Sequence, residues 1–268
     1  MDETTNATER RRWNDPYWAG VWPKREQLTG AVTELLLDSA ELATGQRVLD
    51  IGSGAGITTL EAARRVGPTG SVVGADVSVP LCNFASRRAE QANASGVKFV
   101  VADMQMDSID GPPFDAAISQ FGVMFFEAPT TAFANVRRHL LPGSRFSFAC
   151  WQPLALNRWH LNHAVGDFLM PPRGDGPLPG PFGLSDPVYA TQVLHGAGWN
   201  AIERQALEVN VTVKRDAIVD DDQLTFIGIS PPQLEAAEQA VNRHLAEFRR
   251  ADGNFDLTLA IQLFTCSA

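Results

Sequence analysis

The sequence has few cysteines and no pairing pattern among them. Its 268 residues include three, at Cys82, Cys150 and Cys266, and none forms a C-x-x-C pair. An odd number of widely spaced cysteines disfavours both a disulfide framework and a structural zinc site, and we expect no metal. We therefore expect a reducing compartment, with the cytoplasm as the default location.

Long hydrophobic runs and an excess of positive charge are also missing. No stretch of 18 apolar residues occurs, and residues 1–13 are polar, unlike a signal peptide. We therefore expect no membrane partner. The 22 basic residues are outnumbered by 31 acidic ones, which gives a net charge of −9. A surface of this charge repels phosphate backbones, so nucleic acid is not an expected partner either.

What is present is an ordinary globular composition in which short apolar runs alternate with helical patterns. Apolar residues make up 44% of the chain and charged residues 20%. The patterns predict strands at 47–51, 71–75, 98–102, 114–119, 145–150, 202–213 and 257–264. They predict helices at 26–42, 57–66, 79–94, 128–140, 186–197 and 231–250. Such alternation is typical of βαβ units and of a parallel sheet with helices on both faces.

A glycine-rich segment follows the first predicted strand and precedes a helix. Gly52, Gly54 and Gly56 allow a tight turn and a close approach to a ligand, and the helix N-terminus offers free amides. Dinucleotide enzymes use G-x-G-x-x-G, but here the third glycine comes one residue early and position 57 is Ile. The spacing favours a nucleoside without a pyrophosphate, and leaves a nucleotide-dependent dehydrogenase as a distant alternative.

Two acidic residues end the next two predicted strands. Asp76 can accept both hydroxyls of a ribose, and Asp103 can accept the amine of an adenine while Met104 packs on the ring. Ligands of open α/β sheets bind at the carboxyl ends of the strands. A glycine loop and two acids at three consecutive strand ends therefore predict an adenosine-binding site.

These residues resemble the class I S-adenosylmethionine-dependent methyltransferases, in the small-molecule branch near the UbiE-like and type-11 enzymes. The resemblance covers about residues 26–150 and includes 48–56, 73–76, 101–104, 114–119 and 141–146. It implies a Rossmann-like, mostly parallel sheet of seven strands whose last strand is antiparallel. We expect one domain, with a helical cap (1–43), a donor-binding core (44–150), a lid (151–185) and a C-terminal part of the sheet with a helical insertion (186–268).

The resemblance also implies which residues bind S-adenosylmethionine. Asp50 and the segment Gly52, Ser53, Gly54 and Gly56 would face the methionine part. Asp76 and Val77 would hold the ribose, Asp103 and Met104 the adenine, and Ser119 and Gln120 would lie beside the sulfonium. Ser53 departs from the Cys of many members, but backbone contacts of the loop survive that change.

Aromatic residues and two histidines are the candidates on the acceptor side. Tryptophans suit a cap over a sulfonium cation, and we expect substrate contacts from Trp18, Trp22, Phe121, Met124 and Trp151. Plain core packing is the alternative for Trp18, Trp22 and Met124. His160 and His163 are candidate general bases, because histidine titrates near neutrality; an ordinary surface role is the alternative.

The combined hypothesis is transfer of a methyl group to an oxygen, nitrogen or carbon of a small molecule. The donor is already activated, so the protein mainly needs to align the acceptor and exclude water. A non-methylation reaction on the same fold, such as cyclisation or decarboxylation, and a non-catalytic donor-binding module are the alternatives. The sequence indicates neither the acceptor nor the oligomeric state.

Overall fold

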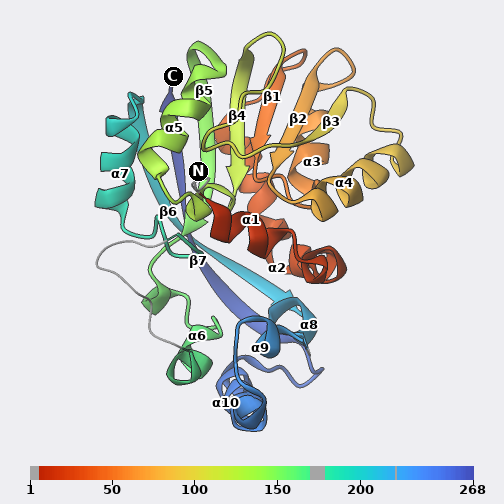
Figure 1. The fold of residues 1–268 in the computed structure, drawn as a ribbon, viewed down its shortest axis with the longest axis vertical. Coiled ribbons are helices and arrows are strands. Elements are labelled where there is room, and N and C mark those ends of the chain that lie inside the picture. The colour runs from red at the N-terminus through yellow and green to blue at the C-terminus, as the bar shows by residue number, and fades with distance from the viewer. Residues whose placement is uncertain (1–5, 170–178, 221) are drawn as a thin grey trace.

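The structure is a computed structural model that describes residues 6–169, 179–220 and 222–268. Its centre is a sheet of seven strands in the order β3-β2-β1-β4-β5-β7-β6 (Figure 1). The strands are β1 (Arg47–Ile51), β2 (Ser71–Asp76), β3 (Val97–Val101), β4 (Phe114–Gln120), β5 (Leu140–Trp151), β6 (Asn200–Val213) and β7 (Phe255–Ser267). Only β7 runs antiparallel to its neighbours, β5 and β6. The predicted fold is confirmed.

The longer helices are α1 (Ala7–Trp13), α2 (Pro16–Ala40), α3 (Ile57–Val66), α4 (Val79–Gln91), α5 (Pro129–Arg138), α7 (Pro187–Gly196) and α10 (Leu234–Leu245). Those from α2 to α7 cover the two faces of the sheet. Side chains of α2 and α3 pack on one face, around Val48 and Ile118. Those of α5 and α7 pack on the other, where rings of Phe133, Phe146 and Trp199 meet. Burying each such ring contributes about 1.5–3 kcal/mol.

Helix α2 differs most from the expectation. The sequence predicts a helix from residue 26, but α2 begins at Pro16, where Asp15 caps it by accepting a hydrogen bond from the Tyr17 N–H at 2.9 Å. Pro23 lies inside the helix and removes one main-chain donor. Gly20 and Pro23 together make this stretch resemble a helix break, although packing of the tryptophans against the rest of the fold keeps it helical.

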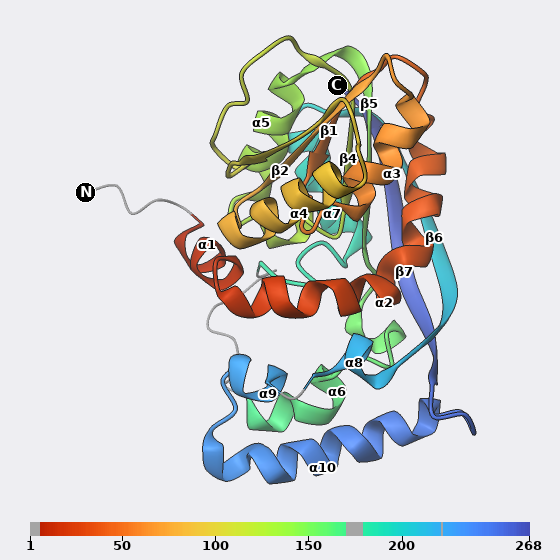
Figure 2. The ribbon, with the colours of Figure 1, turned by 90° about the vertical axis from the view of Figure 1, so that its right-hand side faces the viewer.

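Short helices form a separate layer beyond α2. They are α6 (Asn162–Val165), α8 (Arg215–Ile218) and α9 (Gln223–Phe226), and with α10 we call them the helical lobe. Figure 2 shows the lobe below α2, at the far end of the long β6–β7 hairpin. Single 3₁₀ turns complete the secondary structure: η1 (Val123–Phe125), η2 (Leu154–Leu156), η3 (Gly166–Phe168), η4 (Pro231–Gln233) and η5 (Ala246–Phe248).

The segment expected as a lid contributes to the core. Trp159, Leu161, Val165 and Leu184 are buried against the sheet and the lobe. Residues 170–178 of that segment lie outside the described residues. Across the described ranges, no helix combines the length and the apolar character needed to cross a bilayer.

Candidate functional site

The glycine loop after β1 is held tightly by its surroundings. Gly52, Gly54 and Gly56 all have positive φ, at 68°, 53° and 86°. A Cβ at Gly52 would come within 2.6 Å of the backbone of Gly122, and one at Gly56 within 2.6 Å of the Phe99 ring. Gly54 instead faces an aromatic side chain, because its Cβ would lie 3.1 Å from the indole nitrogen of Trp22. The backbone of Gly122 and the ring of Phe99 therefore leave no room for side chains at Gly52 and Gly56, while Gly54 faces α2.

Asp76, at the end of β2, joins this loop to the start of α4. One carboxylate oxygen accepts a hydrogen bond from the Gly54 N–H at 2.8 Å, and the other accepts one from the Ser78 N–H at 2.9 Å. Burial raises the pKa of Asp76, while these backbone donors lower it. Val77 follows directly, and its carbonyl accepts a hydrogen bond from Asn14 at 2.9 Å.

Asp103, just after β3, is 3% exposed and is fully engaged within the chain. Its carboxylate accepts hydrogen bonds from the Gln105 N–H at 3.0 Å and from the side-chain amide of Asn6 at 3.2 Å to each oxygen. Met104 beside it is buried in the hydrophobic core. The three predicted strand ends thus lie along one edge of the sheet.

Three buried polar atoms around the loop have no hydrogen-bond partner among the described residues. They are Oδ1 of Asp50, Oγ of Ser53 and Oε1 of Gln120. The other oxygen of Asp50 accepts from the Thr59 hydroxyl at 2.6 Å, and the amide nitrogen of Gln120 donates to the Thr29 carbonyl at 3.2 Å. Buried polar atoms are normally paired, so three unpaired ones in a single place indicate a ligand site.

The carboxyl of Asp50 has a raised pKa at this site. Burial raises the pKa of its carboxyl to about 7, and the neighbouring Asp76 adds to the effect, while the Thr59 hydrogen bond opposes it. A carboxyl with one unpaired oxygen and a pKa near neutrality is suited to a cationic ligand. Ser119, the last buried residue of β4, donates to the Ile51 carbonyl at 2.7 Å and fixes the neighbouring strand end.

The predicted aromatic residues divide into two groups. Trp18 and Trp22 belong to a cluster with Trp13, where ring centroids lie 4.5–6.0 Å apart, and Trp18 also contacts Phe226 of α9. The second group is a stacked pair at the ends of β4 and β5. Trp22 lies against Gly54 of the glycine loop, whereas Trp18 connects α2 to the helical lobe.

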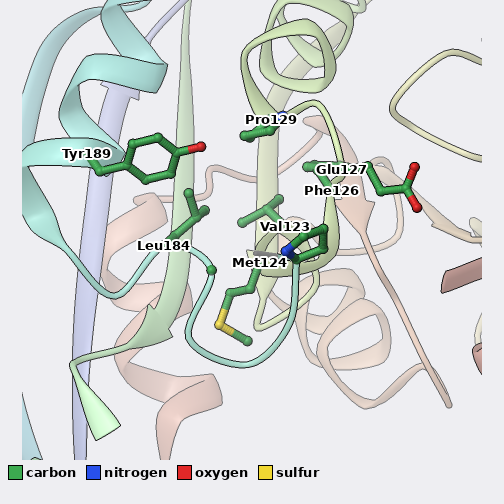
Figure 3. A pocket seen from close by; sticks show the side chains of 9 residues that line it. Val123, Met124, Phe126, Glu127, Pro129, Leu184 and Tyr189 are labelled. Carbon is green, nitrogen blue, oxygen red and sulfur yellow. The ribbon is translucent and has the colours of Figure 1, made fainter. Parts of the chain in front are cut away.

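Phe121 and Trp151 stack with ring centroids 4.1 Å apart and an interplanar angle of 13°. Phe121 has a φ of 62°, which is strained for a bulky residue and is a feature that gathers at functional sites. Met124 is not in this stack. It lines a small pocket with Leu184 and Tyr189, between η1 and the start of α7 (Figure 3).

The two histidines have different surroundings. His160 adjoins the rings of Trp159 and Phe182, at 5.5 and 5.0 Å, and burial lowers its pKa to about 4. Since Trp159 contacts Trp151, His160 is joined to the Phe121–Trp151 stack. His163 is exposed, pairs with the Leu154 carbonyl at 3.0 Å and stacks on His244 of α10. Its general-base role stays a prediction, as does that of His160.

Sequence reasoning missed two sets of polar contacts at this edge. Asn6 and Asn14 of the N-terminal segment bond to the loops after β2 and β3. Arg25 pairs with Asp220 at 2.8 Å, and Asp220 also accepts from the Tyr17 hydroxyl at 2.6 Å, which ties α2 to the helical lobe. No local sequence pattern predicts either set of contacts, because the partners are separated by about 60 to 200 residues.

Comparison with known proteins agrees with this geometry. A family profile described as "Methyltransferase domain" matches residues 48–143. The aklanonic acid methyltransferase DauC of a Streptomyces species is 31% identical over 113 residues, 42% of this chain and 51% of that protein. The ubiquinone/menaquinone biosynthesis C-methyltransferase UbiE of Pseudomonas savastanoi is 34% identical over 110 residues, 41% of this chain and 43% of that protein.

Residues 48–143 of the chain form a class I S-adenosylmethionine-dependent methyltransferase domain. The resemblance predicted from the sequence is confirmed. The chain spans about half the length of the curated relatives it matches.

Solved structures of this methyltransferase fold align with nearly the whole chain. The YcgJ protein of Bacillus subtilis has a TM-score of 0.59 at 18% identity, covering 89% of this chain and 98% of that one. The [4+2]-cyclase SpnF has a TM-score of 0.57 at 18% identity, covering 88% and 79%. At these identities the likeness bears on the fold.

Proposed function

We propose that the carboxyl edge of β1–β4 binds S-adenosylmethionine. The observation that carries the proposal is the set of unpaired buried atoms of Asp50, Ser53 and Gln120 around a glycine loop. A ligand with an ammonium group, a carboxylate and a cationic sulfur offers partners to such atoms, because two are carbonyl or carboxylate oxygens and one is a hydroxyl. The residues therefore fit the donor.

We assign the donor's parts to residues as follows. Asp50, Gly52, Ser53, Gly54 and Gly56 would bind the methionine part, Asp76 and Val77 the ribose, Asp103 and Met104 the purine, and Ser119 and Gln120 the sulfonium. The hydrogen bond from the Gly54 N–H to Asp76 supports this assignment, because the carboxylate that would bind the ribose also fixes the position of the glycine loop.

We propose that the reaction is methyl transfer to an oxygen, nitrogen or carbon of a small molecule. The bound donor supplies a methyl group on a positively charged sulfur. The chain's own residues orient the acceptor and exclude water, and we assign these roles to Trp18, Trp22, Phe121, Met124 and Trp151. The strained, stacked Phe121 supports a rigid acceptor site at the end of β4.

His160 is the stronger of the two proposed proton acceptors. It adjoins the acceptor-side rings, and its low pKa keeps the imidazole neutral at pH 7. A weak base suffices where the acceptor is an oxygen, because a newly methylated oxygen is an oxonium, which is far more acidic than an imidazolium. His163, which is exposed and faces α10, is the weaker candidate.

The net charge of −9 supports a small-molecule acceptor rather than a nucleic acid. The three cysteines are free and buried, which supports the cytoplasm as the place of action. A non-methylation reaction on the same fold, such as a cyclisation, is the alternative function that the same donor site allows.

Two experiments test the proposal. Calorimetry with S-adenosylmethionine, S-adenosylhomocysteine and NAD should show binding of the first two only, and Asp76→Ala should weaken that binding about ten- to a hundredfold. A cell extract incubated with the protein and methyl-deuterated donor should yield a labelled small molecule together with S-adenosylhomocysteine. Binding without release of S-adenosylhomocysteine would favour the cyclase-like alternative, and NAD binding alone would refute the donor assignment.

A further inference from the structure

The N-terminal segment is hydrogen-bonded across the donor edge of the sheet. The Ser78 hydroxyl donates to the Trp13 carbonyl at 2.6 Å, and Asn14 exchanges two hydrogen bonds of 2.9 Å with the backbone of Val77 and Val79. The N–H of Asn6 donates to Glu127 at 2.5 Å. Figure 1 shows α1 lying across the ends of the central strands. Residues 6–14 therefore contact the loops after β2, β3 and β4.

Asn6 makes the most informative of these contacts. It occupies the N-cap position of α1, where an Asn side chain normally accepts a hydrogen bond from the first turn of the helix. Here no such cap bond exists, φ is 76°, and Oδ1 is buried without a partner among the described residues. The side chain instead donates to both oxygens of Asp103. Asn6 thus gives up helix capping in order to engage the carboxylate.

A primary amide and the amine of a purine are hydrogen-bond donors of the same kind. Asp103 is the residue that we assign to the purine amine, so Asn6 and the donor would use the same two oxygens. We propose that α1 is a built-in competitor of the donor, in which Asn6 takes the place of the purine amine on Asp103 and donor binding displaces residues 6–14. This inference rests on the proposed function.

The fold provides a joint for this displacement. Asn14 ends α1 and Asp15 begins α2 with an extended backbone, φ −65° and ψ 130°. Asp15 caps α2 through Tyr17, so α2 retains its own start when α1 leaves. The segment 6–14 can therefore leave as one unit while α2 stays packed on the sheet, once the ring contacts of Trp13 with Trp18, Trp22 and Phe125 break.

The docked position also carries an electrostatic cost. Glu9 is 4% exposed within α1, and burial raises the pKa of its carboxyl. Arg12 and Trp13 donate to it at 3.1 Å, but the carboxylate of Glu127 also faces it and opposes its charge. A buried carboxylate beside a second one costs free energy, which favours release when a ligand competes for the site.

Limited proteolysis distinguishes a competitor from a lid, because a bound ligand should change the rate of cleavage in α1 in opposite directions. Arg10, Arg11 and Arg12 are consecutive trypsin sites in α1. Trypsin needs an extended chain, so cleavage there reports undocking of the helix. In the full chain, S-adenosylhomocysteine should accelerate cleavage at these arginines if donor binding displaces α1, and should slow it if α1 closes over the donor.

Calorimetry supplies the second readout. Asn6→Ala should tighten binding of S-adenosylhomocysteine about three- to tenfold, the value of a hydrogen bond to a charged group after partial compensation. Thr8→Ala, an exposed change in the same helix, is the matched control and should bind as the wild type does.

Tighter binding by Asn6→Ala together with faster cleavage supports the competitor. Unchanged or weaker binding by Asn6→Ala, or protection of the arginines by ligand, overturns it and leaves the proposed function standing. If neither protein binds S-adenosylhomocysteine, the proposed function fails and the competitor fails with it.

Discussion

Binding of S-adenosylmethionine should release a proton from Asp50. The carboxyl is buried, its Oδ1 has no partner among the described residues, and its pKa is about 7. The donor brings an ammonium group to the glycine loop, and an adjacent positive charge favours the ionised carboxylate. The proton therefore leaves as the ligand arrives, and donor affinity should rise with pH until the free protein is already ionised.

The size of the effect follows from the pKa. If binding ionises Asp50 completely, about nine-tenths of a proton is released at pH 6, about half at pH 7 and about one-tenth at pH 8. As the pH rises toward 7, the dissociation constant should fall by up to about tenfold per pH unit, and above pH 7 it should level off.

Calorimetry in buffers of different ionisation enthalpy measures the released protons directly. Asp50→Asn is the matched control, since it preserves shape and can still accept the Thr59 hydroxyl. The control also subtracts the titration of the donor's own amino group. Proton release that is equal in the wild type and in Asp50→Asn at pH 6 and 7 would refute the argument.

The same carboxyl affects stability in the absence of ligand. Its folded pKa lies above that of the unfolded chain, so the folded state binds the extra proton between about pH 4 and pH 7. The free energy of unfolding contributed by this group is therefore present at low pH and is lost as the pH rises through 7. Urea titrations of the wild type should show this decline, and those of Asp50→Asn should lack it.

Three further predictions concern other residues. Asp76→Ala should weaken donor binding about ten- to a hundredfold, because Asp76 also holds the glycine loop, whereas Asp103→Ala should cost less than tenfold in calorimetry. His160→Ala should lower turnover about a hundredfold with donor affinity unchanged, and His163→Ala should do less, as followed by release of S-adenosylhomocysteine with the identified acceptor. Trp199→Phe should lower the free energy of unfolding by about 1–3 kcal/mol in urea, since its buried N–H bonds to a carbonyl of α5 at 3.1 Å, and should leave donor binding unaltered.

The sheet is accessible to sequence reasoning because its signals are local. β1 and β2 are short apolar runs that end at Gly52 and Asp76, and their predicted bounds agree with the structure to within a residue. The start of α2 was wrong by ten residues because Pro23 is compatible with a helix here. The helix tolerates Pro23 because tertiary packing stabilises it, and a local sequence pattern does not report that packing.

In the candidate site too, some residues have local sequence signals and others do not. Asp50, Asp76 and Asp103 can be found from their positions at strand ends. The contact between Asn6 and Asp103 joins residues 97 apart, and that between Arg25 and Asp220 joins residues 195 apart. Their side chains meet only because α1 and α2 cross the carboxyl edge, and that crossing follows from the folded arrangement rather than from any spacing.

The β6–β7 hairpin has a consequence for how the acceptor side of such an enzyme can diverge. β5 pairs with β7 only as far as Ile261, so β6 is the strand that pairs with residues 255–260 of β7. This two-stranded extension carries α8, α9 and α10 away from the sheet (Figure 2). The part matched by the family profile, residues 48–143, ends before the extension begins. Substitutions in the lobe that spare its contacts with α2, such as Arg25–Asp220, would leave β1–β4 undisturbed. Under the proposed function, a lineage could thus exchange its acceptor and still inherit its donor site.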